Sequence, residues 1–206
     1  MRRTKLEAEQ TRRQILDAAE ECFRENGIMR TTLQVIAEKA GCTRGAIYWH
    51  FTEKHDLLRE VIERTPFVFF SEAEAEAVSR STKPFSSLRH CMLRGLKEVQ
   101  KNRHLRNAIE LAVFGSECPR ELLGENSADK LLSLIHIAVL RGKACGEVKS
   151  DTEVETLTPL IFYVFIGALR TGTLMPGNSL RFRKGMDALN LVFDMVLEKS
   201  EMSNES

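Results

Sequence analysis

The stretch from Thr43 to His50 carries residue types that suit contact with a DNA groove. Arg44 can pair with guanine edges or with phosphate, and the two small residues after it allow a close approach of the backbone. Tyr48, Trp49 and His50 combine aromatic rings with polar atoms that could reach phosphates. On helical spacing alone, Tyr48 and Trp49 could equally be core aromatics. The stretch is therefore a candidate for direct contact with nucleic acid.

Two threonines and a lysine on either side of this stretch are candidates for contacts to the DNA backbone. Thr31 and Thr32 stand directly before an expected helix, where a hydroxyl, free N–H groups and the positive end of the helix dipole favour a phosphate. Lys54, near the start of the next expected helix, is a further candidate. The complete set of candidate DNA-contacting residues is Thr31, Thr32, Thr43, Arg44, Gly45, Ala46, Tyr48, Trp49, His50 and Lys54.

Helical periodicity indicates how these residues would be positioned. Apolar residues recur at spacings of three and four between Ile15 and Phe23, and Gly27 supplies a stop. A second short helix is expected from Leu33 to Ala40, ended by Gly41. Strand signals are almost absent, so the whole chain is expected to be all-α.

The second expected helix and the one after it have the sequence pattern of a helix-turn-helix. Thr31 or Thr32 would cap the second helix, and the spacing from Thr31 to Gln34 suits a capping box. The third helix follows Thr43 and runs to about His50, after a link of three or four residues that contains a glycine. In such a motif the second helix enters the major groove of DNA.

Three sequence elements follow one another from Ile15 to Lys54. They read I-x-x-A-A-x-x-x-F-x-x-x-G, T-T-x-x-x-I-A-x-x-A-G and R-G-A-I-Y-W-H-F-x-x-K. In these elements the stretch from Thr11 to Leu58 resembles the DNA-binding domain of the TetR family of repressors. The form G-A-I-Y-W-H-F further resembles the AcrR/TtgR branch of that family, which represses multidrug efflux pumps.

The resemblance implies a set of DNA contacts and shows one departure. Cys42 stands where valine is usual in the family, and it is expected to pack between the helices. The pairs Arg12-Arg13 and Glu20-Glu21 are interpreted as solvated charged faces, so these arginines are weaker candidates for DNA contact than Arg44. The contacts that the resemblance implies are Thr32, Thr43, Arg44, Gly45, Tyr48, Trp49, His50 and Lys54.

The overall charge does not point to nucleic acid, because the formal net charge is only +1. DNA binding must therefore come from the local arrangement of a few residues and from pairing two copies of the chain. There is no uncharged apolar run of about 18 residues, so no membrane-spanning helix is expected. The basic N-terminus lacks the apolar run of a secretory signal, and the expected location is the cytoplasm.

Motifs for catalysis and for metal binding are not found in the sequence. G-x-S-x-G, a Walker loop, G-x-G-x-x-G and H-E-x-x-H do not occur, so we do not expect an enzyme. The histidines and cysteines, five of each, show no ligand spacing, so neither a metal nor a cofactor is expected. In a cytosol the cysteines are expected to be reduced.

The sequence predicts about nine helices in two domains, a helix-turn-helix domain at 1–53 and a ligand-binding and dimerisation domain at 54–206. A fourth helix is expected from Lys54 to about Ser81, bent or broken at Pro66. The segment from Ser79 to Ser87 is interpreted as a linker between the two domains. Further helices are expected at Phe85–Lys101, His104–Phe114, Arg120–Gly142, Thr152–Gly172 and Leu180–Lys199, with breaks at Asn102, Cys118-Pro119, Gly142–Gly146 and Pro176-Gly177.

The last two expected helices are predicted to form a homodimer interface. The run from Leu160 to Leu169 is apolar all the way round a helix, so it is either buried on every side or shared between its own domain and a second chain. Pro159 either follows a late cap at Thr158 or kinks a helix that begins at Thr152. A two-fold dimer would present two recognition helices to a palindromic operator, whereas a monomeric bundle core is the alternative. The wide apolar face of the last helix is formed by Leu189, Leu191, Val192, Phe193, Val196 and Leu197.

Flexible apolar residues and aromatic residues in the C-terminal helices could enclose a planar or hydrophobic small molecule. Ordinary core packing is the alternative interpretation of the same residues. The expected function is a repressor that such a ligand releases from double-stranded operator DNA. An activator or a redox-responsive regulator with the same DNA-binding domain, or a helical interaction module, is the alternative. The candidate ligand-binding residues are Leu88, Cys91, Met92, Gly95, Val113, Phe114, Phe162, Phe165, Ile166 and Leu169.

Overall fold

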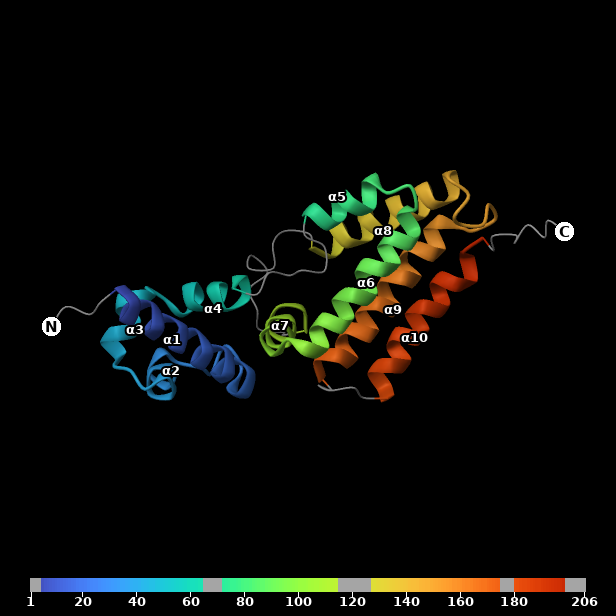
Figure 1. The fold of residues 1–206 in the computed structure, drawn as a ribbon. Coiled ribbons are helices and arrows are strands. Elements are labelled where there is room, and N and C mark those ends of the chain that lie inside the picture. Colours follow the sequence, from blue (N-terminus) through green and yellow to red (C-terminus); the bar gives the residue numbers. More distant parts are fainter. Residues whose placement is uncertain (1–4, 65–71, 115–126, 175–179, 199–206) are drawn as a thin grey trace. The chain divides into compact units, whose positions relative to one another are not determined.

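The structure is a computed structural model, and it describes residues 5–64, 72–114, 127–174 and 180–198. Within these residues every regular element is a helix, apart from one antiparallel bridge between Val148 and Leu197 (Figure 1), which confirms the all-α prediction. The elements are α1 (Lys5–Asn26), α2 (Leu33–Ala40), α3 (Arg44–His50), α4 (Lys54–Glu63), α5 (Glu72–Arg80), α6 (Pro84–Lys101), α7 (Arg103–Ile109), the π-helix η1 (Glu110–Phe114), α8 (Ser127–Ala144), α9 (Val154–Leu174) and α10 (Leu180–Val196).

The helices outnumber the predicted nine because the segment expected as one helix after Lys54 contains both α4 and α5. The expected helix from His104 to Phe114 begins as α7 and ends as the π-helix η1. The predicted bend at Pro66, the helix start at Arg120 and the breaks at Cys118-Pro119 and Pro176-Gly177 lie outside the described residues.

The chain divides into two compact units. The first comprises Met1–Phe67 and Arg103–Glu125, and the second comprises Val68–Asn102 and Asn126–Ser206. This division differs from the predicted boundary after residue 53, because α4 packs against α1 and shares its core. The predicted linker from Ser79 to Ser87 is not a seam either, since α5 and α6 pack together inside the second unit.

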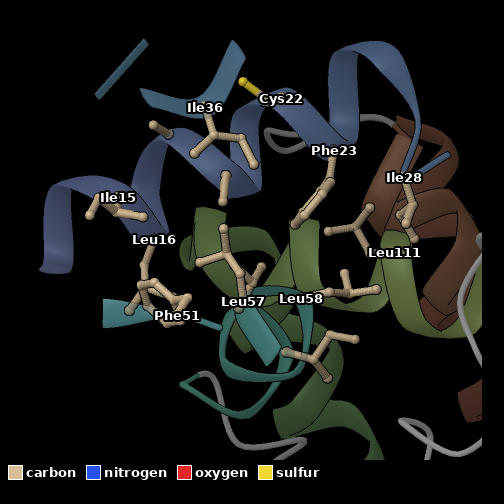
Figure 2. Close-up of a cluster of buried hydrophobic side chains, with 14 of the residues drawn as sticks. Ile15, Leu16, Cys22, Phe23, Ile28, Ile36, Phe51, Leu57, Leu58 and Leu111 are labelled. Carbon is tan, nitrogen blue, oxygen red and sulfur yellow. The ribbon is translucent and has the colours of Figure 1, made fainter. Parts of the chain in front are cut away.

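A hydrophobic cluster holds the helices of the first unit together (Figure 2). Ile15 and Phe23 of α1, Ile36 of α2 and Leu57 of α4 are each at most 1% exposed in it. Burial of one such side chain stabilises a fold by about 1.5–3 kcal/mol. Leu111 of η1 joins the same cluster, although it comes more than forty positions after Ile62, the last α4 residue of the cluster. The helix-turn-helix is therefore built on a core that includes a segment from the middle of the chain.

Local capping groups fix the start and end of α2. Gly41 has a φ of 66°, in the left-handed region that favours glycine, and its N–H and that of the next residue satisfy the last carbonyls of the helix. The Thr32 side chain accepts a hydrogen bond from the N–H of Val35. The capping box predicted from Thr31 to Gln34 is wrong, because the Thr31 hydroxyl donates instead to backbone carbonyls and Gln34 bonds to Glu38.

The second unit is a helical bundle in which α9 packs against α6, α8 and α10. The N–H groups of Phe85 and Ser86 at the start of α6 each donate to the Glu147 carboxylate at 2.8 Å, which satisfies two otherwise unpaired donors. Phe85 also packs on Phe193 of α10, with ring centroids 4.7 Å apart. Of the two positions predicted for Pro159, the structure has the second, inside a helix that begins at Val154.

One helix of the second unit is strongly hydrophobic along its whole length. In the described residues, α9 is long and apolar enough, by length and composition, to cross a membrane. Core helices of soluble proteins pass the same test, and α9 packs against three other helices of its unit. The composition of α9 therefore does not show a membrane-spanning segment, and the expectation that none is present stays a prediction.

Candidate nucleic-acid interface

The expected recognition helix, α3, is fixed by its cap and by a buried residue. The Thr43 hydroxyl accepts a hydrogen bond from the N–H of Ala46 at 3.2 Å, which starts the helix at Arg44. Ile47 is fully buried in the core, and the N–H of Phe51 bonds to its carbonyl at 2.8 Å. Because Ile47 faces inward, the opposite face of this short helix is directed to solvent.

The exposed face of α3 carries an arginine and a tyrosine that hold each other. Arg44 Nη2 donates to the Tyr48 hydroxyl at 3.1 Å, and the guanidinium carbon lies 5.4 Å from the centre of the tyrosine ring. The hydrogen bond to Tyr48 raises the pKa of the Arg44 guanidinium above its ordinary value. The helix therefore presents a positively charged guanidinium whose orientation Tyr48 restricts, which suits contact with phosphates or guanine edges.

The aromatic residues of α3 are not core residues. Tyr48 is 47% exposed and Trp49 is 72% exposed, which excludes the interpretation as core aromatics within this unit. The Trp49 ring meets the half-buried His50 edge to face, with centroids 4.5 Å apart. These side chains form a polar and aromatic tip at the end of the helix, where they are available to a partner.

The small residues at the start of α3 leave space around the backbone. A Cβ atom added at Gly45 would meet only the Thr43 hydroxyl, at 3.9 Å. Internal packing therefore does not require a glycine at this position. The free space is on the outside, where it allows a groove to approach the backbone closely.

The start of α2 offers a second polar site on the exposed surface. Thr32 is exposed, and as the cap residue it precedes N–H groups that have no partner inside the helix. Arg30 is an exposed cation two residues before this cap, and it was not among the predicted contact residues. Its signal is weak, because an isolated arginine in a loop has no distinguishing pattern.

The structure turns two of the predicted contact residues inward. Thr31 is 1% exposed, and its hydroxyl donates to the carbonyls of Cys22 and Gly27 at 3.1 and 2.6 Å. The Lys54 ammonium donates to the carbonyls of Ile28, Met29 and Thr31 at 2.8, 3.3 and 3.0 Å. Because an ammonium group has three donors, Lys54 has none left for a phosphate in this arrangement. Both side chains instead fix the loop before α2.

The predicted ligand-binding residues divide between the two units. Val113 and Phe114 belong to η1 of the first unit, and the others belong to α6 and α9 of the second. The second-unit residues lie on helices that pack together. Leu88, Met92, Gly95, Phe165 and Leu169 are buried there, and Cys91, Phe162 and Ile166 are half-buried.

A hollow of about 430 Å³ lies between α8 and α9 in the second unit. It is lined by Leu132, Ser133, His136, Ile137 and Thr158, so none of the predicted ligand-binding residues contributes to its wall.

The described cysteines, Cys22, Cys42, Cys91 and Cys145, form no disulfide with one another. Cys42 is half-buried and packs against the core of the first unit, as predicted. Burial raises the pKa of the Cys22 thiol, which lies in the same core. Cys118 lies outside the described residues. In the part of the chain that is described, histidine, cysteine and acidic side chains form no group of three that could hold a metal ion.

Known proteins are similar in sequence to this chain, both in the helix-turn-helix and beyond it. Residues 15–61 match the family described as bacterial regulatory proteins, tetR family. The HTH-type transcriptional regulator TtgR of Pseudomonas putida is 30% identical over 181 residues, which cover 85% of this chain and 86% of TtgR. The chain belongs to the TetR family. The resemblance predicted from the sequence elements is thereby confirmed.

Further TetR-family members show how far the likeness extends. The HTH-type transcriptional regulator AcrR of Shigella flexneri is 36% identical over 134 residues, 65% of this chain and 62% of AcrR. The structure of the SmeT–triclosan complex superposes with a TM-score of 0.72 at 29% identity, covering 93% of each chain. SmeT is described as the repressor of the Stenotrophomonas maltophilia multidrug efflux pump SmeDEF. The shared TetR-family fold therefore includes the second unit as well as the helix-turn-helix.

Proposed function

We propose that this TetR-family protein is a transcriptional repressor of a multidrug efflux operon in the cytoplasm. A homodimer binds palindromic double-stranded operator DNA, and a hydrophobic or aromatic small molecule releases it. The observation that carries the proposal is the exposed face of α3, where Arg44 and Tyr48 are held together and Trp49 is open to solvent. The description of SmeT as an efflux-pump repressor supports the choice of target.

The exposed surface of α9 supports dimerisation through the last two helices. Leu160, Tyr163 and Leu174 are 43%, 69% and 55% exposed and recur along one side of α9. On α10, Leu191 and Met195 are 60% and 61% exposed and lie four residues apart. Apolar side chains repeated along one face of each helix are costly in water and favour a second chain as the partner.

The packing of α6 on α9 supports a ligand site within the second unit. The half-buried Cys91, Phe162 and Ile166 lie beside fully buried apolar residues of the same two helices. Their surfaces are apolar and aromatic, so a hydrophobic compound is the ligand class that they favour. The ligand would release DNA by binding better to a dimer in which the recognition helices no longer match successive major grooves.

Substitutions on α3 test the DNA-binding part of the proposal. Fluorescence anisotropy of labelled DNA from upstream of the gene measures the affinity of the wild type, Arg44→Ala and Tyr48→Phe. Arg44→Ala is expected to weaken binding on the order of tenfold or more, because a bidentate base contact contributes about 1–3 kcal/mol. Tyr48→Phe retains the ring but releases Arg44, so a smaller loss is expected.

Arg24→Ala is the matched control for these variants. Arg24 is an exposed arginine of α1 that pairs with Glu25, and its replacement should leave DNA affinity unchanged. Equal affinities for the wild type, Arg44→Ala and Arg24→Ala would contradict recognition by α3.

A further inference from the structure

A buried carboxylate on α1 lies where three helices of the first unit meet. Glu20 is 2% exposed, and its side chain accepts hydrogen bonds on both oxygens. Asn107 Nδ2 donates to Oε1 at 2.6 Å, whereas His104 Nδ1 at 2.8 Å and Arg64 Nη2 lie on Oε2. A carboxylate buried this deeply is tolerated in a fold only with such partners. The geometry of α1, α4 and α7 is therefore tied to this side chain.

The partners of Glu20 stand at the places where the chain passes between the two units. The chain leaves the first unit after Phe67 and returns at Arg103. Arg64 is the last described residue before the first passage, and His104 is the second residue after the return. Asn102 alone separates α6 from α7, so the link between these two helices is one residue long. The residues beside both passages, Arg64 and His104, therefore contact the same Glu20 carboxylate.

The neighbouring carboxylate extends the connection to the helix-turn-helix. Glu21 accepts a hydrogen bond from Arg103, the first residue of α7, and it pairs with Lys39 of α2 at 3.2 Å. The hydrogen bonds from Arg103 and Lys39 lower the pKa of Glu21. Because these groups are partly exposed, this link is weaker than the one through Glu20.

We propose that Glu20 is a positioning residue that transmits displacements of the second unit to the DNA-binding helices. The same helix α1 packs against α2 and α3 through the core around Ile15 and Ile36, so a movement of α1 at Glu20 would act on the helices that position α3. This inference rests on the proposed function, because transmission matters only if the first unit binds operator DNA. The charge on Glu20 is essential to it, since Arg64 and His104 hold a carboxylate.

Hydrogen–deuterium exchange of the full-length protein with and without operator DNA tests this inference. Coupling between two sites is reciprocal, so operator bound to the first unit should slow exchange in α6 and α8 of the wild type. Glu20→Gln keeps the shape of the side chain and an acceptor for Asn107, but it removes the ion pair with Arg64. In this variant the slowing in α6 and α8 should fall by about fivefold or more, the lower end of usual coupling factors. The slowing in α2 and α3 should remain.

Glu60→Gln is the matched control, because Glu60 pairs with Arg12 across α1 and α4 away from both passages. In the Glu60→Gln variant, operator DNA should slow hydrogen–deuterium exchange in α6 and α8 as much as in the wild type. If Glu20→Gln does not fold, His104→Ala replaces it: His104 is about half exposed, and its loss should weaken transmission in the same direction.

Two results would overturn the role of Glu20. One is equal slowing of α6 and α8 in the wild type and the variants, and the other is no slowing of these helices in the wild type. Absence of slowing in α2 and α3 of the wild type would instead contradict the proposed function.

Discussion

At the scale of single residues, hydrogen bonds decide which polar side chains near the helix-turn-helix remain available to DNA. The two adjacent threonines differ in exposure and in their hydrogen bonds. Thr31 is buried and donates to backbone carbonyls, whereas Thr32 caps α2 and is exposed. Sequence reasoning could name both but could not separate them, because the carbonyls that receive the Thr31 hydroxyl belong to the end of α1 and the loop after it.

Lys54→Met tests the structural role of that lysine. Loss of the three hydrogen bonds to the loop before α2 should lower the free energy of unfolding by about 1–3 kcal/mol, measured by urea denaturation. If Lys54 does not contact phosphate, the slope of log affinity for operator against log salt should stay unchanged. A slope reduced by about 0.9 would reveal one lost phosphate contact and contradict this account.

Thr43→Ala tests the cap that starts the recognition helix. Loss of the hydrogen bond from the Ala46 N–H should cost about 1 kcal/mol of stability, measured by thermal unfolding. Thr43→Ser retains the hydroxyl and should restore most of the loss. Equal destabilisation by the serine and alanine variants would mean that the hydroxyl does not act as the cap.

At the scale of elements, the parts with local signals were predictable and the parts made by distant packing were not. The bounds of α2, Leu33–Ala40, match the prediction because a threonine cap and Gly41 mark its ends within the sequence itself. The placement of α7 and η1 in the first unit has no such signal, since it depends on Leu111 entering a distant core. Glu20 was interpreted as part of a solvated face, yet its partners come 44 to 87 residues later.

The exposure of Tyr48 and Trp49 agrees with their choice as candidate contacts, which stays a prediction, whereas the predicted ligand-binding residues are not brought together. The family sequence pattern contains the recognition helix, so its residues could be named individually. The predicted pocket combined flexible and aromatic residues on faces that could point inward, and Val113 and Phe114 belong to a different unit from the rest. Helical periodicity indicates which residues face inward, but not which helices face each other.

Gly142→Ala tests a close helix contact in the second unit. A Cβ at this position would lie 2.8 Å from Val148 Cγ2 and 3.0 Å from Phe85 Cβ. Overpacking of this kind costs about 1–3 kcal/mol, so the melting temperature should fall, although alanine favours a helix. A melting temperature equal to or above that of the wild type would show that the contact can relax.

At the scale of the whole molecule, a nearly neutral chain has to bind DNA by placing a few charges well and by pairing two copies. The net charge of +1 gives no general attraction to phosphate. The proposed dimer would double the contacts proposed for Arg44 and its neighbours, and the spacing of its recognition helices would set which DNA it fits. In the proposed dimer, the apolar face of α9 and α10 is thus as necessary to DNA binding as α3.

Tyr163→Glu tests this dependence. Tyr163 is 69% exposed on α9, so a charge there should leave the folded chain intact but oppose a second chain, giving a monomer in sedimentation velocity. Operator affinity should fall with the loss of the dimer. Lys97→Glu on the exposed side of α6 is the control and should stay dimeric. A dimeric Tyr163→Glu protein would place the interface elsewhere.

Release of DNA by a ligand is the most direct test of the central claim. Fluorescence anisotropy of labelled upstream DNA, titrated with the wild type in the absence and presence of triclosan and other hydrophobic compounds, measures it in one experiment. We expect two chains per palindromic site and a 5- to 150-fold loss of affinity, about the usual coupling range, with at least one compound. No binding to the DNA, or binding that none of the compounds weakens, would contradict it.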